Sequence, residues 1–190
     1  MSPKVINLSL KDKKFLLELA RKAIEAGLKN VPLKIDIKTI PERLKKKMCS
    51  FVTLTIDGNL RGCIGKLIPI KPLYLDVIEN AEGSAFHDPR FCPLSREEFK
   101  KVKIEISILG PPQKIFYKDT KQLLGFLKKE KPGVILKKGF REATFLPQVW
   151  EELADPIEFL SHLSLKAGLL KDDWKEGAEI YIYYIEKISE

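Results

Sequence analysis

The segment LRGCIG at residues 60–65 carries the side chains with the clearest chemical potential. Arg61 stands two residues before Cys63, and because strand side chains alternate between faces, both would point to the same side of a strand. A thiol beside a permanent cation ionises more readily and becomes a better nucleophile. Arginine also binds carboxylates and phosphates through two hydrogen bonds. Gly62 and Gly65 would let a ligand or another backbone approach closely.

The same alternation puts Leu60 and Ile64 on the opposite face, where we expect the core. A purely structural alternative remains open for the polar pair. Cysteine is often a small buried hydrophobe, and Arg61 would then pair with an acid. Cys63 is therefore a candidate nucleophile and Arg61 a candidate anion-binding residue.

A second candidate segment is the loop at residues 85–91, AFHDPRF. Asp88 and Arg90 are candidates to orient a ligand, since binding residues concentrate on loops. In the structural alternative, Asp88 caps local N–H groups and Arg90 tethers the loop to a carboxylate. His87 is a candidate base for Cys63, although separation along the chain says nothing about contact.

The third candidate segment, ATFLPQVW at residues 143–150, passes from a strand into a helix. Thr144 and Gln148 would supply neutral hydrogen bonds near a helix N-terminus, a position that favours anions. The apolar neighbours of these two residues are expected in the core. The polar pair therefore serves either a binding site or packing.

The cysteines and histidines do not have the spacing of a metal site. Cys49, Cys63 and Cys92 form no closed disulfide set and lack the paired spacing of zinc ligands, and His87 and His162 are far apart. We expect reduced thiols and no metal.

Capping signals place the elements of the first half. Ser9 and Asp12 have capping-box spacing, which predicts a helix over 9–27 that ends at Gly27. A hairpin follows over 51–67, then a helix near 73–85. A second capping box at Ser95 and Glu98 precedes a strand over 102–108.

The second half repeats this order. A helix at 121–129, a hairpin over 133–146, helices at 148–153 and 156–167, and a strand over 179–188 are predicted. Hairpin, helix and strand thus occur twice, with Arg61 and Arg141 in corresponding places. This indicates an internal duplication, although ordinary alternation in an α+β chain is the alternative.

The fold prediction is an α+β protein with a mostly antiparallel mixed sheet. At 190 residues the chain suits one domain over 1–190. We expect it to be two-lobed, with lobes at about 48–112 and 113–190 and the N-terminal helix beside them.

Charge and hydropathy bear on whether the chain is a nucleic-acid-binding, membrane or secreted protein. The net charge of +8 invites nucleic-acid binding, but the excess is lysine interleaved with glutamate, as on a solvated surface and as in hyperthermophile proteins. No apolar run is long enough for a bilayer, and residues 1–14 lack the apolar region of a signal peptide. We expect a soluble cytoplasmic protein for which nucleic acid and membrane are unlikely partners.

Five segments together resemble the AMMECR domain family: LRGCIG, AFHDPRFCPL at 85–94, ATFLPQV at 143–149, FVTL at 51–54 and KAGL at 166–169. The resemblance covers nearly the whole chain and is that of a prokaryotic, stand-alone member. It implies a two-part α+β fold with an internal repeat and no established activity. It also implies association with Memo-type and radical-SAM-type proteins. The family pattern does not fix a histidine at His87, and other members carry Glu where this chain has Gln148.

Three functional hypotheses follow. In the first, the two halves enclose a cleft for a small anionic or peptide-like ligand, with Cys63 as a possible nucleophile and Asp88 as the orienting group. In the second, the motifs form the surface of a non-catalytic partner-binding module. In the third, lysines bind nucleic acid weakly. The sequence leaves enzymatic activity, cofactor and oligomeric state open. The candidate ligand-binding residues are Arg61, Gly62, Gly65, Arg90, Thr144 and Gln148.

Overall fold

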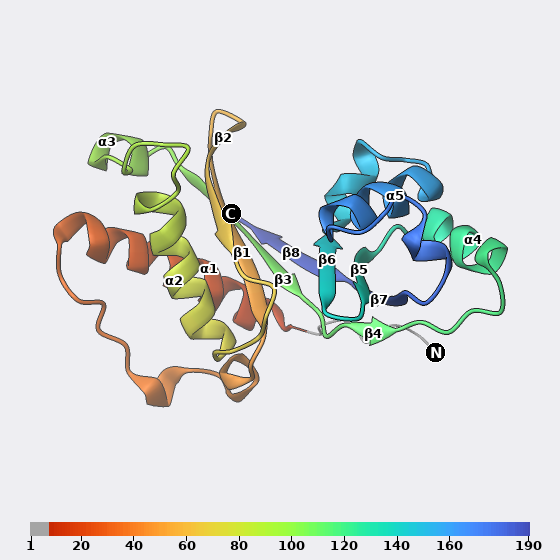
Figure 1. The fold of residues 1–190 in the computed structure, drawn as a ribbon. Helices are drawn as coiled ribbons and strands as arrows, with labels where there is room; N and C mark the ends of the chain where they lie inside the picture. The colour runs from red at the N-terminus through yellow and green to blue at the C-terminus, as the bar shows by residue number, and fades with distance from the viewer. Residues whose placement is uncertain (1–7) are drawn as a thin grey trace. The chain divides into compact units, whose positions relative to one another are not determined.

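The computed structural model describes residues 8–190, which divide into two compact units (Figure 1). Of the described residues, the larger unit contains 8–110 and Glu186–Glu190, and the smaller unit contains Pro111–Ile185. Residues 1–7, part of the segment for which no signal peptide is predicted, lie outside the described residues.

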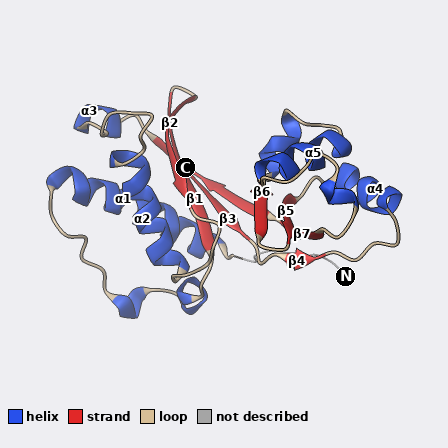
Figure 2. Cartoon of the chain, in the orientation of Figure 1, coloured by secondary structure: helices blue, strands red, loops and turns tan. Residues whose placement is uncertain are grey.

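The larger unit packs helices on one face of a four-stranded sheet (Figure 2). The sheet order is β2-β1-β3-β8, and β1 pairs antiparallel with both β2 and β3. Apolar residues of alternating positions, such as Val52 and Leu54 in β1 and Ile104 and Ile106 in β3, face the helices. The elements are α1 (Leu10–Lys29), β1 (Cys49–Ile56), β2 (Asn59–Gly65), α2 (Leu73–Phe86), α3 (Arg96–Phe99), β3 (Lys103–Leu109) and β8 (Ile185–Ser189).

Both predicted capping boxes are present. The Ser9 and Ser95 side chains accept backbone N–H groups at the starts of α1 and α3, and Asp12 and Glu98 bond back to the cap backbones. The predicted end of α1 at Gly27 is wrong. The helix continues to Lys29, and Asn30 adopts the left-handed conformation at φ 53°. Gly27 instead gives room to Phe86 of α2, whose ring would lie 2.4 Å from a Cβ at that position.

The smaller unit has its own sheet, in the order β4-β7-β5-β6, and its own core. Trp150 and Phe159 stack with ring centroids 3.7 Å apart in that core. Segment 148–153, predicted as a helix, forms a short 3₁₀ turn, η3 (Pro147–Glu151). The remaining elements are β4 (Gln113–Lys114), α4 (Thr120–Glu130), β5 (Gly133–Lys138), β6 (Arg141–Phe145), α5 (Pro156–Lys166), η4 (Asp173–Lys175) and β7 (Glu179–Tyr183).

The α+β class and the internal repeat are confirmed. In each unit a helix precedes a hairpin, a second helix follows, and a third strand pairs with the first strand of the hairpin. The strand order β2-β1-β3 in the larger unit corresponds to β6-β5-β7 in the smaller. Both hairpins turn through two residues, Asp57–Gly58 and Gly139–Phe140, and β1 and β5 pair antiparallel with their neighbours.

The pairing of the strands corrects the predicted correspondence between residues of the two hairpins. Arg141 corresponds to Asn59, because each is the first residue after its two-residue turn, whereas Arg61 is the extra residue of a bulge in β2 and has no counterpart in β6. Beyond the bulge, Cys63 corresponds to Thr144. The predicted equivalence of Arg61 and Arg141 is therefore wrong.

The predicted final strand over 179–188 is also wrong as a single element. The chain breaks at Tyr184, so that β7 lies inside the sheet of the smaller unit and β8 forms an edge of the sheet of the larger one. Within residues 8–190, none of the helices combines the length and hydropathy that crossing a membrane requires.

Candidate functional site

The bulge in β2 decides which way the LRGCIG side chains point. Leu54 pairs with Gly62 and Thr55 with Leu60, which leaves Arg61 as the extra residue. Because the bulge interrupts the alternation, Leu60 is 44% exposed, and its predicted core position is wrong. Ile64 does face the helices: its Cγ2 lies 3.1 Å from where a Cβ on Gly83 of α2 would stand.

The glycines of this segment permit close approach of protein backbone and side chains. A Cβ on Gly62 would lie 2.1 Å from the Ser84 carbonyl oxygen, at the C-terminal end of α2. A Cβ on Gly65 would lie 2.3 Å from the Phe51 ring. The close approach that Gly62 and Gly65 were predicted to allow is therefore filled by this chain's own backbone and side chains.

The Ser84 hydroxyl joins α2 to both strands of the hairpin. It accepts a hydrogen bond from the Ile64 N–H at 2.8 Å and donates one to the Val52 carbonyl oxygen at 2.7 Å. Val52 and Ile64 are directly opposite each other in the hairpin. A side-chain hydroxyl thus bridges two facing strand residues, and this fixes the height at which α2 lies on the hairpin.

Asp88 and Arg90 cap the outer edge of β2, which is an edge strand of the sheet. The Cys63 N–H donates to Asp88 Oδ2 at 2.8 Å, and Arg90 Nη2 donates to the Cys63 carbonyl oxygen at 3.3 Å. The same ion pair therefore satisfies both outward-facing peptide groups of Cys63. Unpaired edge groups invite pairing with other strands, and this loop covers them.

Asp88 is held as a carboxylate by these contacts. Asp88 is only 4% exposed. Both of its carboxylate oxygens accept hydrogen bonds from Arg90, including one from Nη2 at 2.7 Å. These bonds are the main reason why the pKa of Asp88 lies well below its ordinary value, with the Cys63 N–H adding to the effect. The pKa of Arg90 is raised in turn, chiefly by the bond to Asp88.

Arg61 is held by a second carboxylate. Its Nε and Nη2 donate to the two oxygens of Glu98 at 2.8 and 3.1 Å, and Nη2 also donates to the Cys92 carbonyl oxygen at 2.8 Å. Hydrogen bonds from Arg61, followed by the Ser95 N–H, lower the pKa of Glu98 to about 2. Glu98 thus caps α3 and orients Arg61 at once.

The two guanidinium groups share one aromatic ring. The guanidinium carbon of Arg61 lies 5.6 Å from the centre of the Phe91 ring, and that of Arg90 lies 5.5 Å from it. The Arg90 side chain is 53% exposed despite its bonds to Asp88, and Cys92 is also exposed. We call Arg61, Cys63, Arg90, Phe91 and Cys92 the motif surface.

The Cys63 thiol lies on the sheet face opposite the helices, half-buried beside a neutral hydroxyl. Thr53 faces it directly across the hairpin, with Oγ1 and Sγ 3.3 Å apart. His87 is exposed at the end of α2, where its ring contacts Phe86. Within the described part of the chain, no hydrogen bond joins His87 to Cys63.

Thr144 and Gln148 belong to the smaller unit. Thr144 Oγ1 donates to the Val134 carbonyl oxygen at 2.9 Å and lies 3.0 Å from the Tyr183 hydroxyl. Gln148 lies in η3, and its buried Oε1 has no hydrogen-bond partner among the described residues. The other six candidate residues come together in the larger unit: Arg61, Gly62, Cys63, Gly65, Asp88 and Arg90.

Sequence reasoning missed Thr53, Ser84 and Glu98 as partners of the motif. A signal for Ser84 was present, because Asp76, Asn80, Ser84 and Asp88 recur every four residues and all four are buried. Polar residues at helical spacing on a buried face mark hydrogen bonds to a neighbouring element. In residues 8–190, no group of three or more histidine, cysteine or acidic side chains is arranged to hold a metal ion.

Comparisons with known proteins agree with this fold. The family model described as AMMECR1 matches residues 17–188. Protein MK0488 of Methanopyrus kandleri is 42% identical over 188 residues, covering 96% of this chain and 90% of the relative. Protein NEQ441 of Nanoarchaeum equitans is 40% identical over 171 residues, covering 88% and 94%.

A solved structure shows the same fold. The crystal structure of the uncharacterized protein PH0010 from Pyrococcus horikoshii matches with a TM-score of 0.77 and 37% identity, covering 95% of this chain and 92% of the other. Together with the matched segment, these similarities show that the chain belongs to the AMMECR1 family.

Proposed function

We propose that the protein is a cytoplasmic, non-catalytic module that binds a partner protein through the motif surface. The observation that supports this is the internal pairing of the motif charges: Arg61 with Glu98, and Asp88 with Arg90 and the Cys63 backbone. These carboxylates act as fixed acceptors, since hydrogen bonding keeps both of them ionised. They hold the surface in one conformation and are poorly suited to exchange protons with a substrate.

The groups left facing outward are of the kinds that dominate binding energy at protein interfaces. Arginine and aromatic side chains are enriched among such residues. Arg90 is half-exposed yet fixed by several hydrogen bonds, so little side-chain entropy is lost when a partner contacts it. Phe91 is half-buried, and the half-exposed guanidinium of Arg90 and the largely buried guanidinium of Arg61 both lie near its ring.

This chemistry fits a peptide segment that carries a carboxylate next to an apolar side chain. The carboxylate would contact the exposed edge of Arg90, and the apolar side chain would pack on Phe91. The Memo-type and radical-SAM-type proteins implied by the family resemblance are the partners to test first.

The test is a binding titration between the purified protein and the Memo-type and radical-SAM-type proteins encoded in the same genome. We expect Phe91→Ala to weaken binding by at least about tenfold, as for a residue at the centre of an interface. Arg96→Gln is the matched control, because Arg96 is exposed nearby in α3 and is outside the motif surface. Equal binding by wild type and Phe91→Ala would refute the proposal.

A second candidate is an enzyme that uses Cys63 as nucleophile. It is favoured by a half-exposed thiol with a hydroxyl 3.3 Å away and the Arg90 guanidinium bonded to the same residue. In that case a small anionic or peptide-like substrate would bind at Arg90, with Asp88 orienting the guanidinium. The two candidates differ in which side chain function requires: the binding module requires Phe91 and tolerates Cys63→Ser, whereas the enzyme requires the Cys63 thiol.

A further inference from the structure

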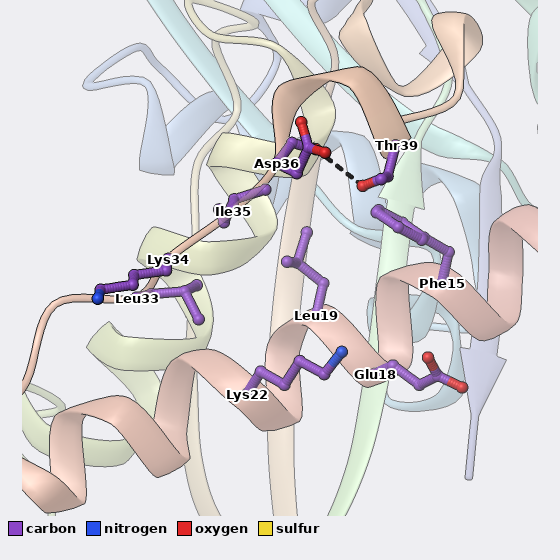
Figure 3. A pocket seen from close by; sticks show the side chains of 9 residues that line it. All are labelled: Phe15, Glu18, Leu19, Lys22, Leu33, Lys34, Ile35, Asp36 and Thr39. Atoms are coloured by element: carbon purple, nitrogen blue, oxygen red, sulfur yellow. Dashed lines mark hydrogen bonds between the residues drawn. The ribbon is translucent and has the colours of Figure 1, made fainter.

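A pocket on the larger unit lies between α1 and the segment at residues 33–39 (Figure 3). Its volume is about 130 Å³, and none of its lining residues belongs to the motif surface. Binding in this pocket is therefore independent of the proposed function.

One wall of the pocket is a single stripe of α1. Phe15, Glu18, Leu19 and Lys22 follow the spacing i, i+3, i+4, i+7, which puts them on one helix face. Phe15 and Leu19 supply apolar surface, and Glu18 and Lys22 supply opposite charges one turn apart. Figure 3 shows Phe15 and Leu19 projecting from α1 toward the segment at 33–39, with Glu18 and Lys22 further out along the same helix.

The other wall is the segment that follows α1. Leu33 and Ile35 are half-buried against the core, whereas Lys34 and Asp36 between and after them are exposed. Asp36 caps the short 3₁₀ turn Ile37–Thr39: its carboxylate accepts the Lys38 N–H at 2.9 Å, and its carbonyl oxygen accepts the Thr39 hydroxyl at 2.8 Å. These bonds fix the far end of the wall.

The size of the cavity limits the apolar part of a ligand. A cavity of roughly 150 Å³ lined by aliphatic and aromatic side chains holds a benzene molecule. The pocket is half-open and also has polar lining, so a leucine-sized or phenyl group would pack against Phe15, Leu19, Leu33 and Ile35 on one side only.

Glu18 and Lys22 set the charge of the ligand. No ion pair or hydrogen bond engages Lys22 among the described residues, and Glu18 contacts Lys14 at 3.9 Å with both side chains largely exposed. Residues one turn apart have Cβ atoms about 5–6 Å from each other, which a compact head group can span. A ligand ammonium would contact Glu18 while its carboxylate contacts Lys22.

We propose that this pocket binds a small zwitterion with a leucine-sized or phenyl side chain, that is, a free α-amino acid of the branched or aromatic class. The side chain packs against the apolar lining residues, and the ammonium and carboxylate groups pair with Glu18 and Lys22. Both charges of the ligand contribute to binding.

The test is a titration of the ¹⁵N-labelled full chain with L-phenylalanine, followed by amide chemical shifts. Shifts are expected at residues of α1 and 33–39 that line the pocket. Two analogues lack one charge each: 3-phenylpropionate has no ammonium group and 2-phenylethylamine has no carboxylate. Each is expected to bind roughly three- to fivefold more weakly, as for the loss of one exposed ion pair.

Two variants test the residues. Lys22→Gln is expected to weaken L-phenylalanine binding roughly three- to fivefold and to leave the affinity for 2-phenylethylamine unchanged. Lys11→Gln is the matched control, an exposed lysine of the same helix outside the pocket, and should bind as wild type. Leu33→Trp, which fills the cavity, should abolish the shifts while the remaining spectrum stays that of the folded protein.

Three results would overturn the proposal. One is the lack of any shift with L-phenylalanine at 20 mM, a concentration chosen well above the roughly millimolar affinity that so small a ligand can reach. Another is binding of either single-charge analogue at least as tight as that of L-phenylalanine. The third is equal affinity of Lys22→Gln and Lys11→Gln for the amino acid.

Discussion

Gly62 shows at the level of one residue why the LRGCIG segment has its composition. A methyl group there would meet the Ser84 carbonyl oxygen at 2.1 Å, and that oxygen belongs to backbone that cannot rotate away. The glycine is required by helix packing. Arg61, Cys63 and Asp88 are likewise engaged with neighbouring protein groups, so this part of the sequence encodes how α2 and its following loop attach to the hairpin.

Gly62→Ala is expected to lower the free energy of unfolding by about 1–3 kcal/mol, the usual range for overpacking. Gly125→Ala is the matched control. Gly125 lies in α4 with open space where its Cβ would stand, so alanine should stabilise the helix by about 0.5–1 kcal/mol. Chemical unfolding of both variants measures this. A Gly62→Ala protein as stable as wild type would contradict the packing argument.

Asp88 should make stability depend on pH in acid. Its pKa in the folded protein lies below the ordinary value near 4, so its stabilising effect is fully present above pH 4 and is lost as the pH falls below that value. Asp88→Asn is expected to be less stable at pH 7 by about 1–2 kcal/mol, and the difference from wild type should shrink as the pH is lowered from 5 towards 2.

Unfolding midpoints measured across that pH range test this. Glu97→Gln, at an exposed carboxylate that pairs with Lys100, is the control and should follow wild type at every pH. If the stability difference between Asp88→Asn and wild type stays constant down to pH 2, the partners of Asp88 do not lower its pKa.

Among the elements, α2 is the one that organises the site. It meets the hairpin through polar side chains at every fourth residue: Asp76 accepts the Ser50 N–H at 2.7 Å, Asn80 donates to the Ser50 carbonyl oxygen at 2.9 Å, and Ser84 bridges the two strands. Asp88 continues the series beyond the helix end. Hydrogen bonds of this kind fix the helix in register along the strands, which apolar contacts alone would not do.

Ser84→Ala should therefore loosen the hairpin locally. We expect a loss of about 1–3 kcal/mol, because the Ile64 N–H and the Val52 carbonyl oxygen both lose a partner. Hydrogen exchange of the Ile64 amide should become faster. Ser161→Ala in the equivalent helix α5 is the control: its buried hydroxyl has no hydrogen-bond partner among the described residues, so alanine should be neutral or stabilising. Unchanged exchange at Ile64 would rule out the bridge.

Local signals were enough to predict most elements. The two capping boxes and the strand that becomes β3 are signalled by residues close together in the sequence, and each is observed. The bulge at Arg61 was not predicted, because it is defined by pairing with β1 and leaves no local mark. The partners of Arg61 and Asp88 were not predicted either, since Glu98 and the Cys63 backbone are brought to them by tertiary structure.

For the molecule as a whole, the repeat gives two units of the same strand order with separate cores. Within residues 8–190 the smaller unit is continuous in sequence, whereas the larger unit is completed by the C-terminal strand β8. Arg21 of α1 holds this end, because its Nε donates to Glu190 Oε1 at 2.6 Å and its Nη2 to the Val102 carbonyl oxygen at 2.9 Å. The break at Tyr184, which divides the predicted last strand between the units, follows from this topology.

Residues 111–185 expressed alone should fold, since they contain a complete sheet and an apolar core that includes Trp150, Phe159 and Trp174. Residues 8–110 alone should be less stable than the larger unit in the full chain, because β3 loses its neighbour β8. Thermal unfolding of both fragments by circular dichroism checks this. An unfolded 111–185 fragment, or an 8–110 fragment as stable as the full chain, would contradict the division.

Partner binding at the motif surface, as proposed, requires no chemistry at Cys63. The most direct measurement is the affinity of the Cys63→Ser protein for the Memo-type or radical-SAM-type partner, beside that of Phe91→Ala. We expect Cys63→Ser to bind within about twofold of wild type and Phe91→Ala to lose at least about tenfold in affinity. Loss of binding in Cys63→Ser with full binding in Phe91→Ala would contradict the proposal and would move the function to the thiol.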